Sequence, residues 1–116
     1  MTIRDTINGI REELRQHPPA DTSRCSELIV MLTALQGNVH DEIGRWEALH
    51  LKNMSDMLDA DPKLGVEKLK IKAQAMEPYT YLQTAKRVAE LTNEMIQGLK
   101  YRFRSLEQEW KEAHNL

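Results

Sequence analysis

The side chains best suited to binding chemistry form the run Lys100-Tyr101-Arg102-Phe103-Arg104, in which cations alternate with aromatic rings. Cations neutralise phosphates and an exposed ring stacks on a base, so such a run is typical of single-stranded nucleic-acid binding. The predicted nucleic-acid-binding residues are Lys68, Lys70, Lys72, Lys86, Arg87, Tyr101, Arg102 and Arg104. The other interpretation is an ordinary solvated face, because these cations point to several sides of a helix.

The charges of the chain are segregated along the sequence, although the overall net charge is only −2. Residues 1–61 carry six Lys and Arg against eleven Asp and Glu, a net charge of −5. Residues 62–104 carry nine against four, a net charge of +5. Two interpretations remain: an acidic helix pairs with a basic helix, or the basic half binds a polyanion.

Residue patterns typical of catalysis are weak in this sequence. Glu47 and His50 have the Glu-x-x-His spacing of carboxylate-bridged metal bundles, but no second motif accompanies them, which favours ordinary packing. Cys25 is the single cysteine and lies on an apolar stripe, so we expect a small core residue rather than a nucleophile. Glycine-rich phosphate loops, nucleophile elbows and zinc-ligand spacings do not occur. We therefore expect no enzyme activity, no metal and no cofactor.

A heptad pattern in the last third of the chain determines how these side chains are positioned. Apolar residues alternate at steps of three and four, with Thr92 as the polar exception: Leu82, Ala85, Ala89, Thr92, Ile96, Leu99, Phe103, Leu106, Trp110 and Ala113. This spacing places one narrow stripe along a helix and requires a partner helix to cover it.

The remaining apolar periodicity predicts an all-α fold in one domain, residues 1–116. Its helices are predicted at 2–16, 23–60, 62–76 and 79–114, with breaks at Pro18-Pro19, Asp61-Pro62 and Glu77-Pro78. The two long helices should form an antiparallel, coiled-coil-like hairpin, accompanied by a short N-terminal helix and a basic helical connector.

The apolar stripe at 82–113 can be paired with the apolar stripe of the predicted helix 23–60, starting directly at the connector. This pairing predicts which residues of the two long helices lie opposite each other. Met57 then lies opposite Leu82 and Trp46 lies near Thr92. In this register Arg102 and Arg104 have no acidic residue opposite them. The extra apolar residues Val88, Leu91 and Met95 widen the stripe beyond what one helix covers, which predicts a homo-oligomer with these residues at its interface.

Apolar run length and cysteine usage indicate the compartment. The longest apolar run, residues 28–35, is eight residues long and therefore far shorter than a membrane span. A lone cysteine excludes an intrachain disulfide and suits a reducing environment. We expect a cytoplasmic protein without membrane contact.

Three segments carry a resemblance to a known class of proteins. Residues Lys70–Ala75, the tyrosines Tyr79 and Tyr81, and Leu99–Glu107 combine a basic connector with a long helix ending in Leu-Lys-x-Arg-x-Arg-Ser-Leu-Glu. This order resembles small helical phage proteins of the recombination-mediator type, which help to load a recombinase onto single-stranded DNA. The resemblance implies a ring-like oligomer in which basic residues bind the single strand.

Two functions are therefore predicted. The first is a non-catalytic, oligomeric accessory protein that binds single-stranded DNA through the basic segment 62–104. The second is a helical protein-interaction module, for example a virion component or an inhibitor of a host or phage enzyme, because apolar positions remain uncovered on the hairpin.

Overall fold

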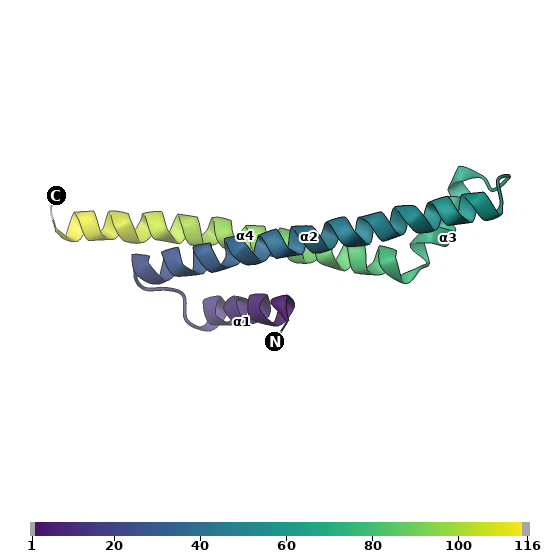
Figure 1. The fold of residues 1–116 in the computed structure, drawn as a ribbon. Coiled ribbons are helices and arrows are strands. Elements are labelled where there is room, and N and C mark those ends of the chain that lie inside the picture. The colour runs from purple at the N-terminus through teal and green to yellow at the C-terminus, as the bar shows by residue number, and fades with distance from the viewer. Residues whose placement is uncertain (1, 115–116) are drawn as a thin grey trace. The chain divides into compact units, whose positions relative to one another are not determined.

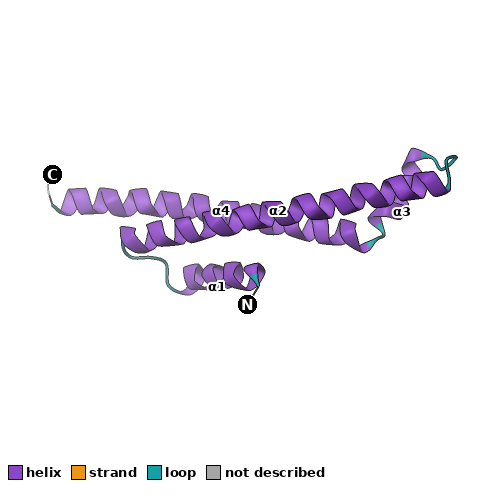
Figure 2. Ribbon diagram, in the orientation of Figure 1, coloured by secondary structure: helices purple, strands orange, loops and turns teal. Residues whose placement is uncertain are grey.

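The computed structural model describes residues 2–114, and all of the regular secondary structure in this range is helical. The four helices are α1 (Ile3–Gln16), α2 (Thr22–Ala60), α3 (Val66–Gln74) and α4 (Glu77–Ala113) (Figures 1 and 2). This confirms the predicted all-α fold, in which the long helices α2 and α4 pair as an antiparallel hairpin. None of the helices in residues 2–114 combines the length and apolarity needed to cross a bilayer.

Helix starts and ends follow local capping chemistry. At the start of α1 the Thr2 hydroxyl accepts from Asp5 N at 3.1 Å, and the Asp5 carboxylate accepts from Thr2 N at 3.0 Å. This reciprocal capping box satisfies two backbone N–H groups, and it holds the pKa of Asp5 below its ordinary value. At the start of α2 the Asp21 carboxylate accepts from Arg24 N at 2.8 Å. The second helix consequently begins one residue before the predicted position.

The predicted connector helix at 62–76 is too long. Leu64 N donates to Asp61 O at 3.0 Å and Lys63 N donates to the Asp61 carboxylate, so the chain turns before Gly65 and α3 is confined to Val66–Gln74. In contrast, α4 begins at Glu77, with Pro78 inside its first turn. Proline costs little there because its missing N–H would have no helical partner.

The chain divides into two compact units. The first unit consists of Met1–Asn38 and Ala89–Leu116, and the second unit is Val39–Val88. The long helices α2 and α4 each contribute to both units, whereas α1 belongs to the first and α3 to the second.

The core of the first unit is aliphatic and combines three helices. Its buried cluster takes residues from α1, α2 and α4: Ile10, Cys25, Leu28, Leu32, Ile96, Leu99 and Leu106. Burial raises the pKa of the Cys25 thiol, which fits the predicted role as a small core residue. Phe103 is only partly buried against this cluster.

The heptad stripe is confirmed as far as Leu106 but not at its last two positions. Leu82, Ala85 and Leu106 are buried, whereas Trp110 remains 53% exposed and Ala113 is exposed as well. The reason lies at the start of α2, since Trp110 and Ala113 line a surface pocket together with Ala20, Asp21 and Thr22, which belong to the α1–α2 loop and the first residue of α2. A loop covers the end of α4 less completely than a helix would.

The second unit buries Val39 of α2 and Leu82 and Ala85 of α4, and it also contains two ring contacts between these helices. Trp46 of α2 stacks on Tyr81 of α4 with their ring centroids 4.7 Å apart. One helical turn further along α2, the His50 ring lies 5.3 Å from that of Tyr79. Leu69 and Ala73 are the buried residues of α3.

The predicted register between the long helices is wrong. Trp46 was expected beside Thr92, but its stacking partner is Tyr81, so α4 is displaced by about three helical turns. The prediction joined the two helices directly at the connector. Instead, Tyr79 near the start of α4 meets His50, so α2 continues beyond this point while α3 buries its own apolar face within the second unit.

Candidate interaction surface

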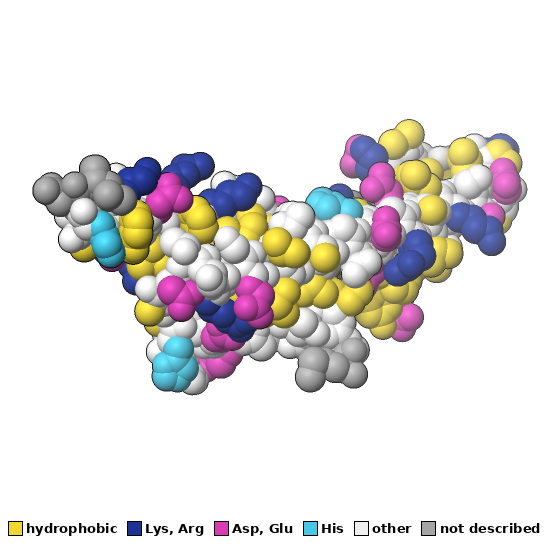
Figure 3. Space-filling view, turned by 60° about the vertical axis from the view of Figure 1, so that its left-hand side comes forward, with side chains coloured by type: hydrophobic (Ala, Val, Ile, Leu, Met, Phe, Trp, Pro, Cys, Tyr) yellow, Lys and Arg dark blue, Asp and Glu magenta, His cyan; other side chains and the backbone are white. Residues whose placement is uncertain are grey.

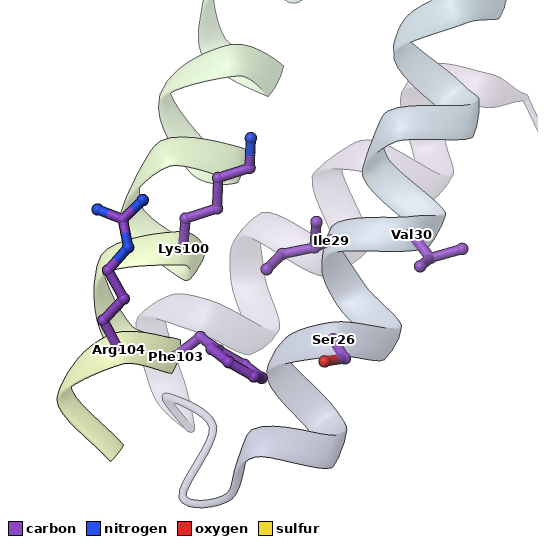
Figure 4. Close-up of a pocket in the computed structure, with 6 residues that line it drawn as sticks. All are labelled: Ser26, Ile29, Val30, Lys100, Phe103 and Arg104. Atoms are coloured by element: carbon purple, nitrogen blue, oxygen red, sulfur yellow. The ribbon is translucent and has the colours of Figure 1, made fainter. Parts of the chain in front are cut away.

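A groove runs between α2 and α4 in the first unit (Figure 4). Its lining comes from Ser26, Ile29 and Val30 on α2, and from Lys100, Phe103 and Arg104 on α4. Ile29 and Phe103 lie between the two helices, and the cations Lys100 and Arg104 flank them on the α4 side. Val30 is 68% exposed, which leaves a β-branched apolar side chain in solvent at the edge of the groove.

This groove lies on the face of the hairpin opposite α1. Arg102 faces the α1–α2 loop, because its Nε donates to Pro19 O at 3.1 Å. Successive residues of an α-helix are rotated by about 100°, so residues two positions apart point in nearly opposite directions. Lys100 and Arg104 therefore point away from the loop. The same reasoning applies to α2, where Arg24 binds α1 and Ser26 lines the groove.

An ion pair holds α1 against the face of the hairpin opposite the groove. Both oxygens of the Glu13 carboxylate accept from the Arg24 guanidinium, which also binds Glu27 at 2.6 Å. Hydrogen bonding to Arg24 holds the pKa of Glu13 below its ordinary value, and the same bonds raise the pKa of Arg24. The guanidinium thus connects α1 to α2, while the opposite face of the hairpin stays open.

The open face is positively charged on one side. Among the residues that line the groove are two cations and no carboxylate. One turn further along α4, Glu107 forms an ion pair with Lys111 at 3.7 Å, and at least half of each side chain is exposed to solvent. Exposed pairs of this kind contribute about 0–1 kcal/mol, so Glu107 can exchange partners easily.

The predicted nucleic-acid-binding residues fall into two groups. Lys68, Lys70, Lys72, Lys86 and Arg87 are exposed in the second unit, whereas Tyr101, Arg102 and Arg104 belong to the first. The second unit contains eight Lys and Arg and eight Asp and Glu, and therefore has no net charge. On the face shown in Figure 3, Lys and Arg side chains lie in small groups with Asp or Glu close by. The basic residues between positions 62 and 88 thus share their unit with the acidic part of α2.

Arg102 differs from the other predicted cations. Its hydrogen bond to Pro19 O and its half-buried position assign it to holding the α1–α2 loop. The sequence predicted no acidic residue opposite Arg102, and the partner found is a backbone carbonyl that the sequence did not indicate, whereas Arg104 is exposed. Tyr101 is 74% exposed.

The predicted oligomer residues Val88, Leu91 and Met95 are half-buried. Met95 packs against the core of the first unit. The apolar surface left for a second copy at these positions is thus smaller than the sequence indicates.

The groove itself was not predicted. One sequence signal points to it: residues 28–39 contain no Lys, Arg, Asp or Glu, although several of them are exposed. A helix in water normally has a charged outer face, so a charge-free face on a surface helix indicates contact with something else.

The Glu47 and His50 pair does not form part of a larger ligand set. Within residues 2–114, no group of three or more His, Cys, Asp or Glu side chains is placed to hold a metal ion. His50 instead packs beside Tyr79, and its Nδ1 atom is buried without a hydrogen-bond partner. Burying this nitrogen without a hydrogen-bond partner costs free energy in the second unit.

No protein-family model, curated protein sequence or solved structure matches this chain. The side chains of the groove and their charges are therefore the basis for assigning a function.

Proposed function

We propose that this chain is a non-catalytic protein-interaction module that binds an amphipathic helix in the groove between α2 and α4. The observation that supports this function is the open apolar face opposite α1, where Ile29, Val30 and Phe103 line a groove between α2 and α4. A groove between paired helices commonly binds the apolar face of a third helix.

The charges beside the groove indicate which partner helices would bind in it. Lys100 and Arg104 border the groove on the α4 side, and the lining residues include no acid. A partner helix with glutamates beside its apolar anchors is therefore favoured over one with lysines. Complementary charge of this kind contributes more to selectivity and association rate than to affinity.

Two synthetic peptides test this function. Both carry leucines at i, i+3, i+4 and i+7 of an amphipathic helix; one has glutamates flanking the leucines and the other has lysines. With isotope-labelled protein, the glutamate peptide should shift the amide resonances of residues 26–30 and 100–104, and it should bind more tightly than the lysine peptide. If neither peptide perturbs these residues, the proposed function is wrong.

Single-stranded nucleic-acid binding, in an accessory role like that of phage recombination mediators, is the second candidate. Tyr101 supports it, because this ring is 74% exposed and stands between the cations Lys100 and Arg104 in the sequence. An exposed ring among cations is suited to stacking on a base.

Oligonucleotide binding across a salt series tests the second candidate. Replacing Arg104 with glutamine should weaken binding and reduce the salt slope by about 0.7, the value for one phosphate contact on a single strand. Lys52→Gln is the control, since Lys52 is exposed on α2 outside the predicted basic set. Identical salt slopes for wild type and the Arg104 variant would exclude this role for Arg104, and failure of the wild type to bind at low salt would exclude the function.

A further inference from the structure

We propose that the amphipathic helix bound in the groove is α4 of a second copy of this chain, with Phe103 as its apolar anchor and Glu107 as the acid beside it, so that two hairpins pack groove to groove about a two-fold axis. This inference rests on the proposed function and names the partner.

The first argument is the charge order along the open face of α4. Lys100, Arg104 and Glu107 are spaced at i, i+4 and i+7, and therefore share one side of the helix with Phe103. When two copies of such a stripe cross antiparallel midway between Phe103 and Arg104, Arg104 of each copy comes opposite Phe103 of the other, and Lys100 of each copy comes opposite Glu107 of the other. A two-fold axis forms this pair twice, as isologous interfaces require.

The second argument is that the centre of the same face is apolar and uncharged. Phe103 and Ile29 lie between the helices of the groove, and Val30 adds a side chain that is 68% exposed. From Leu28 to Asn38 the first-unit part of α2 carries no charged side chain. Pairing two such faces removes apolar surface from water without burying an unpaired charge on α2.

The ion pair already present does not prevent this assembly. Glu107 contacts Lys111 at 3.7 Å, with exposed fractions of 50% and 57% for the two side chains. Because solvent screens such a pair, replacing Lys111 with Lys100 of the second copy costs little.

Val30→Glu tests the apolar part of the interface, and the chain offers a matched control. Val66 is the same residue type, is 64% exposed and lies in the second unit, outside the proposed interface. In sedimentation velocity experiments over a concentration series, the wild type and the Val66→Glu variant should dimerise alike. The Val30→Glu variant should dissociate with a constant at least about tenfold higher. Equal dimerisation of both variants would overturn the inference.

A charge exchange between Lys100 and Glu107 tests the two-fold arrangement. In the Lys100→Glu homodimer two acids face each other at both crossings, and in the Glu107→Lys homodimer two cations do so. Each variant alone should therefore dimerise more weakly than the wild type. A mixture of the two variants should form heterodimers with wild-type affinity, because each facing pair then combines opposite charges. Native mass spectrometry resolves the species, and failure to favour heterodimers would overturn the proposed crossing.

The two proposals fail in different ways. A wild-type protein that stays monomeric at high micromolar concentration overturns the self-association inference. If the glutamate peptide still binds residues 26–30 and 100–104 of that monomer, the interaction-module function stands without it. If the wild type stays monomeric and the glutamate peptide also fails to bind, both proposals are wrong.

Discussion

In the first unit α2 and α4 meet through buried aliphatic side chains such as Leu28, Leu32 and Leu99, whereas in the second unit partly exposed ring pairs between the two helices accompany the buried Val39, Leu82 and Ala85. The first unit adds α1, with Ile7 and Ile10 buried. In the second unit Trp46 and His50 are only half-buried.

This difference predicts that one helix pair supplies both a stable core and a region that opens more easily. Aliphatic side chains that interdigitate under a third helix lose most of their contact with water, and each contributes about 1.5–3 kcal/mol. Rings that stack at a half-open seam keep part of their surface in solvent. We therefore expect the first unit to determine global stability and the second to open at lower free energy.

The largest effect should come from the core of the first unit. Leu28→Ala removes a side chain that is fully buried, and it should lower the free energy of unfolding by about 2–5 kcal/mol. Leu49→Ala on the same helix is the control, because Leu49 is 44% exposed in the second unit and should cost no more than about 0.5 kcal/mol. Urea unfolding followed by circular dichroism measures both, and equal losses would contradict the assignment of the core.

The next effect distinguishes two neighbouring arginines of α4. Arg102→Gln removes the hydrogen bond to Pro19 O and should destabilise the protein by about 1–3 kcal/mol, as expected for a charged donor at a half-buried site. Arg104→Gln should leave the melting temperature nearly unchanged, because Arg104 is exposed. Equal melting temperatures for the two variants would show that Arg102 does not hold the loop.

These two arginines also show what the sequence can and cannot predict. The heptad pattern placed both on the same helix correctly, because a periodic stripe depends only on local spacing. It did not distinguish them, because their roles depend on where the α1–α2 loop lies. Similarly, Pro18-Pro19 and the capping residues predict helix ends well, since capping is local chemistry.

Register and groove required the structure. The pairing of Trp46 with Tyr81 depends on how α3 packs, and Leu69 and Ala73 alone do not indicate which stretch of the long helices they cover. The groove exists because α1 covers one face of the hairpin and leaves the other open. The charge-free run at 28–39 signalled an unusual surface but not which side of α2 would remain exposed.

A smaller effect, of opposite sign, is expected in the second unit. His50→Leu removes a buried nitrogen that lacks a hydrogen-bond partner and should raise the free energy of unfolding by up to about 1 kcal/mol. His50→Gln is the control, since it keeps a polar group in the same place and should not stabilise. Amide hydrogen exchange in residues 45–55 measures the change, and slower exchange in the Gln variant than in the Leu variant would contradict this explanation.

The smallest expected effect concerns the ion pair that connects α1 to α2. Hydrogen bonds from Arg24 lower the pKa of Glu13 below its ordinary value, so the folded state favours the carboxylate more than the unfolded state does. The contribution is therefore complete above the ordinary pKa of a glutamate, about 4.3, and it is lost as the pH falls through the lower folded value. Because both side chains are about one-third exposed, solvent screening keeps the effect within about 0–1 kcal/mol.

Amide hydrogen exchange across α1 measures this loss. Protection of residues 3–16 should decrease between about pH 5 and pH 3, whereas protection of α4 in the same unit should change less. The Glu13→Gln variant should begin with weaker α1 protection at neutral pH and should lose less of it on acidification. A remaining acid response in this variant is expected from Asp5, whose pKa is also lowered by its hydrogen bonds with Thr2. If Glu13→Gln and the wild type lose α1 protection over the same pH range and by the same factor, the Glu13–Arg24 pair does not hold α1 against the hairpin.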